Sequence, residues 1–73
     1  MSLAENLKAA RLNAGMTLNE VADRIGVQHP AVYKWESGIR IPNGIYLVEL
    51  AEVFNTTAEA LVKTNIVNNV KEN

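Results

Sequence analysis

Five neighbouring side chains can meet a hydrogen-bonding ligand if residues 29 to 37 form a helix. On such a helix Val32 and Trp35 face the core, because they lie three residues apart on one side. The opposite side then presents to solvent His29, Pro30, Tyr33, Lys34 and Ser37. A helix face that is rich in hydrogen-bonding groups suits the width of the DNA major groove.

The chain offers little for catalysis or metal binding. It has one histidine and no cysteine, and no serine stands beside a base. No close pair of carboxylates in a cleft can be assembled either. Acid–base catalysis and zinc binding both need several such groups converging on one point. We therefore expect no enzyme, no metal site, no cofactor and no small-molecule substrate.

Size and composition restrict the class of protein further. A chain of 73 residues buries only about 60% of its unfolded surface, which leaves room for one thin core. Without cysteine nothing calls for an oxidising compartment, and no apolar run is long enough for a signal peptide or a membrane span. We expect a cytoplasmic protein. Its net charge of −1 gives no global attraction to nucleic acid, so any argument for nucleic-acid binding must come from local groups of residues.

Capping residues and apolar spacing predict an all-α fold of five helices. Ser2 with Glu5 and Thr17 with Glu20 are capping boxes, in which two residues cap each other's backbone. The first expected helix covers residues 3–13, and the second runs from the Thr17 cap to Gly26. The third covers about nine residues and closes at Gly38, and the fourth runs from the Asn43 cap to Asn55. The fifth is capped by Thr56 or Thr57 and anchored by Leu61 and Val62. The first has its apolar face at Leu3, Leu7, Ala10 and Leu12. Pro30 disfavours helical angles at the residue before it, so the third is expected to start at Pro30 with His29 as its cap.

The second and third helices form a helix-turn-helix. Only Gly26, Val27 and a residue or two separate them, so they must cross at a steep angle. Ala22 is small where the two helices approach, and Gly26 permits the positive φ that the turn needs. We expect residues 1–63 to form this domain. Residues 64–73 are a C-terminal tail whose role as an extra helical turn, a dimer contact or a frayed end stays open.

From about Leu7 to Val62 the chain resembles the phage repressor and Cro-like helix-turn-helix proteins, also called the XRE family. The matching residues are Leu7, Arg11, Gly15 to Thr17, Glu20 to Ala22, Ile25 to Val27, Val32, Trp35 to Gly38, Arg40, Pro42, Leu47, Leu50, Ala51 and Leu61. The resemblance implies a compact five-helix, lambda-repressor-like DNA-binding domain. It also implies that the third helix reads bases, usually as a homodimer on a palindromic operator.

By this resemblance the base-reading positions are Gln28, His29, Pro30, Tyr33 and Lys34. Gln28 either places its amide on adenine or caps the helix. His29 either donates to or accepts from a base edge, or is an exposed histidine without a role. Pro30 offers apolar surface to a thymine methyl group, fixes the first helical turn, or does both. Tyr33 and Lys34 are expected to contact a base or a phosphate, against the alternative of ordinary solvated side chains.

Phosphate contacts are expected at the amide ends of the second and fourth helices, where free N–H groups and the helix dipole favour an anion. Thr17 and Asn43 cap those ends, Gly44 leaves the backbone accessible, and Arg40 supplies positive charge. Leu18 departs from the family, because many members have a phosphate-binding glutamine at this position.

Arg11 and Glu36 match a pair that in relatives joins the first helix to the end of the third. The resemblance therefore implies a structural ion pair that holds the reading helix in place.

Together these features predict a sequence-specific double-stranded DNA-binding transcriptional regulator, with repression as the expected mode. It is expected to read the major groove as a homodimer formed through the fifth helix and the tail, with no membrane partner. The alternative is a protein-binding helix-turn-helix module, such as an antitoxin or the partner of a regulator. That alternative would depend on exposed apolar residues such as Ile39, Ile41 and Ile45.

Overall fold

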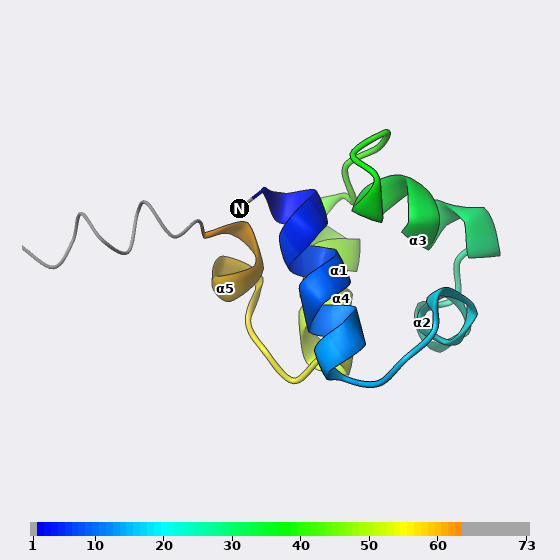
Figure 1. Cartoon of the computed structure of the whole chain (residues 1–73), viewed down its shortest axis with the longest axis horizontal. Helices are drawn as coiled ribbons and strands as arrows, with labels where there is room; N and C mark the ends of the chain where they lie inside the picture. Colours follow the sequence, from blue (N-terminus) through cyan, green and yellow to red (C-terminus); the bar gives the residue numbers. More distant parts are fainter. Residues whose placement is uncertain (1, 64–73) are drawn as a thin grey trace, which may run out of the picture.

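The computed structural model describes residues 2–63, and within this range the chain forms five helices and no strand. These are α1 (Leu3–Asn13), α2 (Leu18–Ile25), α3 (His29–Glu36), α4 (Gly44–Val53) and α5 (Ala58–Val62). In Figure 1, α1 lies in the middle, with α5 on its left and the α2–α3 pair on its right, and it contacts α3 and α5. The fourth helix lies behind α1 in this view and contacts both α2 and α5. The expectation of an all-α fold of five helices is confirmed for the described residues.

Side-chain caps begin α1, α2, α4 and α5 where the sequence predicts them. The two capping boxes are both closed: Glu5 N–H donates to Ser2 Oγ at 3.1 Å, and Glu20 N–H donates to Thr17 Oγ1 at 3.1 Å. The side chain of Asn43 caps α4, and Thr57 rather than Thr56 caps α5. These caps satisfy backbone donors that otherwise have no partner inside the helix.

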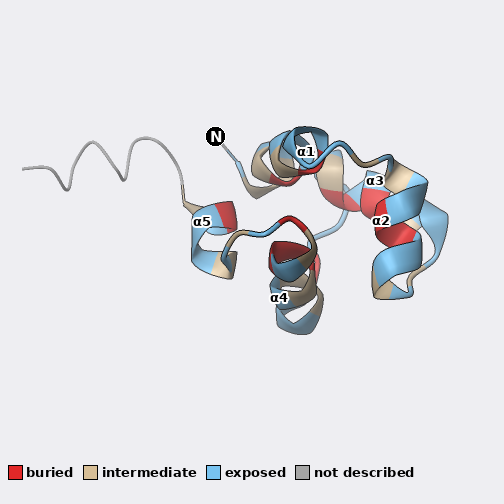
Figure 2. Cartoon of the chain, turned by 90° about the horizontal axis from the view of Figure 1, so that it is seen from below, coloured by how far each residue is buried: buried red, intermediate tan, exposed pale blue. Residues whose placement is uncertain are grey.

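A single core joins the five helices. Its buried apolar residues are Leu7, Val21, Ala22, Val32, Trp35, Leu50, Ala51, Phe54 and Leu61. In Figure 2 the buried segments of α1, α2, α3 and α4 face the centre of the molecule. The indole of Trp35 packs against the ring of Tyr46, with 5.6 Å between the ring centroids. This contact joins α3 to α4.

Three expectations about α1, α4 and α5 are wrong in detail. Leu12 is exposed, because five residues after the buried Leu7 it lies about 140° further round the helix. Val62 is also exposed, so that Leu61 alone of this pair anchors α5. The fourth helix ends at Val53 rather than Asn55, because Asn55 takes a φ of 59° that no right-handed helix can continue.

The turn of the helix-turn-helix has the predicted geometry. Gly26 adopts φ 77° and ψ 36°, the left-handed conformation that glycine takes without steric cost. The N–H groups of Gly26 and Val27 both donate to the carbonyl of Ala22, at 2.9 and 3.0 Å. Ala22 is fully buried between the helices. The turn therefore fixes the angle at which α3 leaves α2.

The start of α3 differs from the prediction. The helix begins at His29, and the residue before it, Gln28, is the cap with an extended backbone. Pro30 is tolerated one residue inside the helix, because the N–H that it lacks has no partner in the first turn. The N–H of Ala31 closes this turn on the Gln28 carbonyl at 3.0 Å.

Residues 64–73, where the tail was expected to add a helical turn or a dimer contact, lie outside the described range. Within that range, every helix is too short or too polar to cross a bilayer.

Candidate nucleic-acid interface

The exposed side of α3 is the one that the helical spacing predicts. Val32 and Trp35 are buried, whereas His29, Pro30, Tyr33, Lys34 and Ser37 are all exposed. The hydroxyl of Ser37 donates to the Tyr33 carbonyl at 2.9 Å, so it is used by its own helix. The other four residues, together with Gln28, which is exposed at the cap of α3, form the surface that we call the recognition face: Gln28, His29, Pro30, Tyr33 and Lys34.

The side chain of Gln28 is free for an outside partner. Gln28 occupies the cap position of α3, but its side chain makes no capping hydrogen bond. Of the two roles that the sequence left open, capping by the side-chain amide is therefore absent. Its carboxamide is exposed and retains both its donors and its acceptor.

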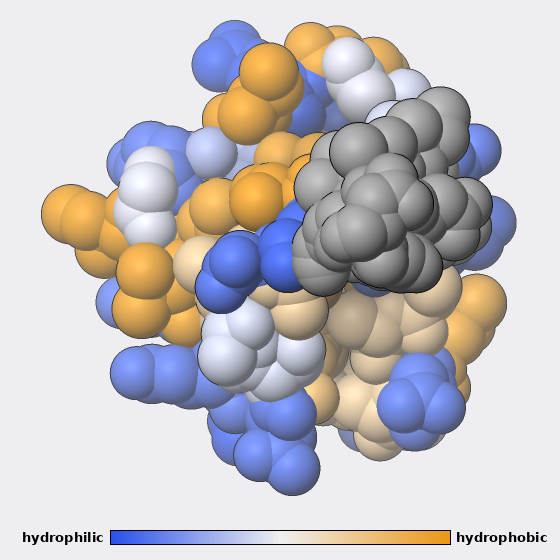
Figure 3. All heavy atoms as spheres, turned by 90° about the vertical axis from the view of Figure 1, so that its left-hand side faces the viewer, coloured by the Kyte–Doolittle hydropathy of each residue, from blue (hydrophilic) through white to orange (hydrophobic). Residues whose placement is uncertain are grey.

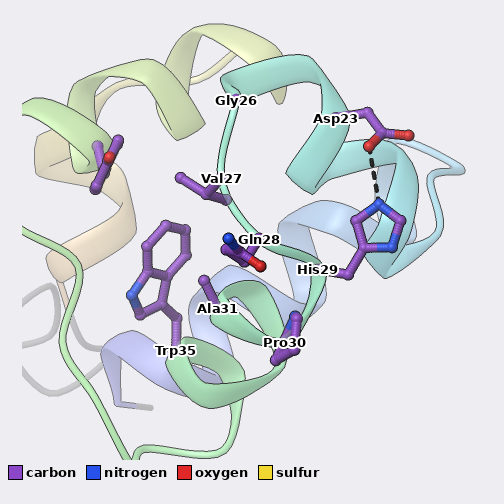
Figure 4. A pocket seen from close by; sticks show the side chains of 9 residues that line it. Asp23, Gly26, Val27, Gln28, His29, Pro30, Ala31 and Trp35 are labelled. Atoms are coloured by element: carbon purple, nitrogen blue, oxygen red, sulfur yellow. Dashed lines mark hydrogen bonds and ion pairs between the residues drawn. The ribbon is translucent and has the colours of Figure 1, made fainter.

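His29 is paired with a residue that the sequence did not single out. Its Nε2 lies 2.8 Å from Oδ1 of Asp23, in the last turn of α2 (Figure 4). Both side chains are exposed, the histidine at 49% and the aspartate at 72%. The contact crosses the turn and connects the two helices. Sequence periodicity does not reveal it, because Asp23 and His29 lie on different helices.

An ion pair anchors the far end of α3. Arg11 Nε lies 2.8 Å from Glu36 Oε2, and Arg11 Nη2 lies 3.1 Å from Glu36 Oε1, which makes the contact bidentate. The remaining terminal nitrogen donates to the Met16 carbonyl at 2.9 Å. The two side chains are only 10% and 7% exposed. The structure thus brings together the predicted pair, and α1 holds α3 through it.

The recognition face continues into a hollow beside the start of α4. Lys34, Arg40 and Asn43 line this hollow together with Gln28 and Tyr46. Two cationic side chains therefore lie close to the amide end of a ten-residue helix. No acidic residue stands in the first turn of α4, and Gly44 leaves open space around its backbone. This end of the molecule is suited to an anion.

The amide end of α2 is less favourable to an anion. Glu20 stands in its first turn and accepts from the Thr17 N–H at 2.8 Å. That carboxylate occupies one of the N–H donors that a phosphate would need, and its negative charge repels a phosphate. Leu18, the first residue of α2, is half-buried and packs against the core. The predicted phosphate residues thus lie at two helix starts. Arg40 and Asn43 lie where no acidic residue stands nearby in the helix, whereas Thr17 lies beside the carboxylate of Glu20.

A second hollow lies under the start of α3. Figure 4 shows Val27, Ala31 and Trp35 lining it, with His29 and Pro30 at its outer edge. Tyr46 also lines it. Sequence analysis missed Tyr46, because a tyrosine in an apolar run resembles core, and only the fold places it beside both hollows.

Known proteins share this fold and part of this sequence. The family model for helix-turn-helix proteins matches residues 7–61. The HTH-type transcriptional regulator ImmR of Bacillus subtilis is 31% identical over 62 residues, which cover 85% of this chain and 49% of that protein. YqaE, an uncharacterized HTH-type transcriptional regulator of the same organism, is 30% identical over 60 residues, covering 82% of this chain and 52% of that protein. The chain thus spans about half the length of these curated relatives.

Among solved structures, the P22 c2 repressor in complex with synthetic operator 9T has the same fold. It superposes with a TM-score of 0.81 at 24% sequence identity, over 86% of this chain and 96% of that one. The match of the family model over residues 7–61 and the geometry of the turn lead to the same assignment. The chain belongs to the helix-turn-helix family of phage repressor and Cro-like proteins.

Proposed function

We propose that this chain binds double-stranded DNA in a sequence-specific manner and regulates transcription, as a repressor. The observation that carries the proposal is an exposed, hydrogen-bonding recognition face on a helix that is fixed at both ends. The turn at Gly26 sets its start, and the buried pair of Arg11 and Glu36 holds its end. The relatives are named transcriptional regulators, and the solved neighbour is a repressor bound to an operator. No catalytic step is part of this proposal.

In this proposal the recognition face reads base edges in the major groove. Gln28 has the amide geometry that pairs with adenine, and Pro30 offers apolar surface to a thymine methyl group. His29 presents a ring nitrogen, and Tyr33 its hydroxyl group. Lys34 reaches guanine or a phosphate, and its place in the hollow beside Arg40 favours the phosphate.

The same proposal assigns the backbone contacts mainly to the start of α4. Asn43, Gly44 and Arg40 supply amide N–H groups and a positive charge at the recognition-face side of the molecule. Thr17 adds a contact at α2, weakened by the carboxylate of Glu20. Such contacts set the orientation of the protein on the duplex and carry no sequence information.

We further propose that the chain acts as a cytoplasmic homodimer on a palindromic operator. With a net charge of −1 and few cations near the recognition face, one copy neutralises few phosphates and binds weakly. A second copy doubles these contacts. The proposed contact includes α5 and the tail, and the exposed Val62 on α5 supports it.

The test is selection of bound duplexes from a random DNA library at moderate salt, followed by sequencing. We expect enrichment of a palindrome whose half-site centres lie about 10–10.5 base pairs apart. Lys34→Ala is expected to weaken binding to the enriched duplex. Lys8→Ala, which removes the same charge from an exposed position on α1, serves as the matched control. If the folded protein enriches no sequence, the proposal is wrong.

One observation favours a second function, a module that binds a protein partner. Ile39, Ile41 and Ile45 are 65%, 80% and 70% exposed, which is unusual for three isoleucines so close in sequence. Figure 3 looks onto the α5 end of the molecule and shows hydrophobic residues gathered along its left and upper edges. A partner-binding protein would lose its partner with Ile41→Ser and keep it with Lys34→Ala. A DNA-binding protein would instead lose DNA binding with Lys34→Ala and keep it with Ile41→Ser.

A further inference from the structure

The contact between Asp23 and His29 stands at the edge of the recognition face. Asp23 lies in the last turn of α2, His29 begins α3, and both line the hollow shown in Figure 4. Within residues 2–63, this is the only hydrogen bond or ion pair of either side chain, and Nδ1 of the histidine has no partner there. Nδ1 lies on the side of the ring away from Asp23 (Figure 4).

This contact decides which ring nitrogen carries the proton. An ionised carboxylate only accepts hydrogen bonds, so the nitrogen that faces Asp23 must be the donor. A neutral imidazole has one protonated nitrogen and one with a free lone pair. With the proton on Nε2, the free Nδ1 is an acceptor.

The major groove distinguishes bases by the same donor and acceptor pattern. Adenine and cytosine present amino groups there, whereas guanine and thymine present only acceptors at the corresponding edge. An acceptor at Nδ1 therefore pairs with the amino group of adenine or cytosine. The opposite tautomer would instead donate from Nδ1 to an acceptor, which guanine, thymine and adenine N7 all provide, and it could not pair with an amino group.

We propose that Asp23 is a positioning residue that sets the base preference of His29, by holding the ring in the Nε2–H tautomer and presenting Nδ1 to an adenine or cytosine amino group. This inference rests on the proposed function. One neutral hydrogen bond of this kind corresponds to a preference of about three- to tenfold at one base position.

A merely structural role for Asp23 leads to different expectations. An exposed ion pair contributes little to stability, so the loss of Asp23 should not unfold the domain. Asp23 also carries negative charge next to the proposed DNA surface, where it repels phosphates. Removing it should therefore strengthen binding to duplexes of arbitrary sequence while weakening the preference for one base. A residue that only supports the fold would weaken both.

The first experiment needs no DNA. His29 is the only histidine of the chain, so ring ¹⁵N NMR of the free protein at pH 8 reports on this ring alone. We expect a protonated Nε2 and an unprotonated Nδ1, and a mixture of tautomers in Asp23→Asn, whose amide can either donate or accept. A protonated Nδ1 in the unaltered protein would overturn the inference whatever the protein binds.

The second experiment measures base preference at pH 8 by duplex selection. We expect one position per half-site that prefers adenine or cytosine, and we expect this preference to be lost in His29→Ala and reduced about three- to tenfold in Asp23→Asn. In the double variant Asp23→Asn, His29→Ala, the base preference should equal that of His29→Ala alone, because Asp23 acts through His29. Glu52→Gln is the control, because it removes one exposed carboxylate of α4 that makes no side-chain hydrogen bond within the described range.

The outcomes separate this inference from the proposed function. If the unaltered protein selects an operator and Asp23→Asn selects the same bases with the same strength, the inference is wrong and the proposed function stands. If neither protein selects any sequence, both are wrong. A lost preference together with a lower melting temperature would assign Asp23 to the fold and overturn the inference as well.

Discussion

Glu36→Ala tests how firmly α3 is held. The change removes the carboxylate that pairs with Arg11 through contacts of 2.8 and 3.1 Å, and it leaves a guanidinium that is only 10% exposed. Removing one partner of a buried pair costs about 3–5 kcal/mol, since the other charge stays buried without compensation. A domain of 73 residues has a total free energy of unfolding of about 4–11 kcal/mol. The variant should therefore lose about a quarter or more of its stability, and its Tm should fall by about 12–40 °C.

Urea unfolding measures this loss, with the fluorescence of Trp35 as the probe, because Trp35 is the only tryptophan of the chain and is buried in the core. Glu59→Gln is the control: its pair with Lys63, at 3.4 Å, is exposed and should contribute less than about 1 kcal/mol. The double variant Arg11→Met, Glu36→Leu should recover much of the loss, since no unpaired charge remains. A cost below about 1 kcal/mol for Glu36→Ala would refute the reasoning.

Four further changes, one of them a control, test the core, the turn and the DNA contacts. Trp35→Ala should cost about 3–5 kcal/mol through the cavity that it leaves, measured by circular dichroism during thermal unfolding; a melt like that of the unaltered protein would place Trp35 outside the core. Gly26→Ala should cost about 1–2 kcal/mol in urea unfolding, from the positive φ alone, because a Cβ meets open space there. Gly44→Ala, equally open and without a positive φ, should cost less, and equal losses would contradict this account. Lys34→Ala should lower the salt dependence of duplex binding by about one unit of slope while leaving the Tm nearly unchanged, whereas an unchanged slope would remove Lys34 from the phosphate contacts.

Much of the fold follows from short-range signals in the sequence. The pairs Ser2–Glu5 and Thr17–Glu20 lie three residues apart, so their capping boxes depend only on local geometry. The turn at Gly26 is equally local, since the positive φ needs a particular residue type. The first residue of α3 could not be predicted in this way. A proline disfavours helical angles at the preceding residue only on average. Here the helix begins one residue earlier than expected, at His29.

The exposed side of α3 was predictable from helical spacing, but the neighbours of that side were not. Asp23 reaches His29 across a turn, and Lys34, Arg40 and Asn43 converge from α3, a loop and α4. These contacts depend on how side chains from separate elements approach one another in space, which capping motifs and helical spacing do not specify. The roles of the individual recognition residues came from the family resemblance, and they stay predictions.

The most direct test of the central claim is to map which backbone amides respond when duplex DNA is added. Amide NMR spectra recorded at about 50 mM salt with a duplex of arbitrary sequence need no knowledge of the operator, because phosphate contacts dominate such binding. We expect the largest shifts in residues 28–34 and in the first turn of α4, and small shifts in α5. If the amides of residues 28–34 are unchanged when the protein is saturated with duplex, α3 does not read DNA and the account is contradicted.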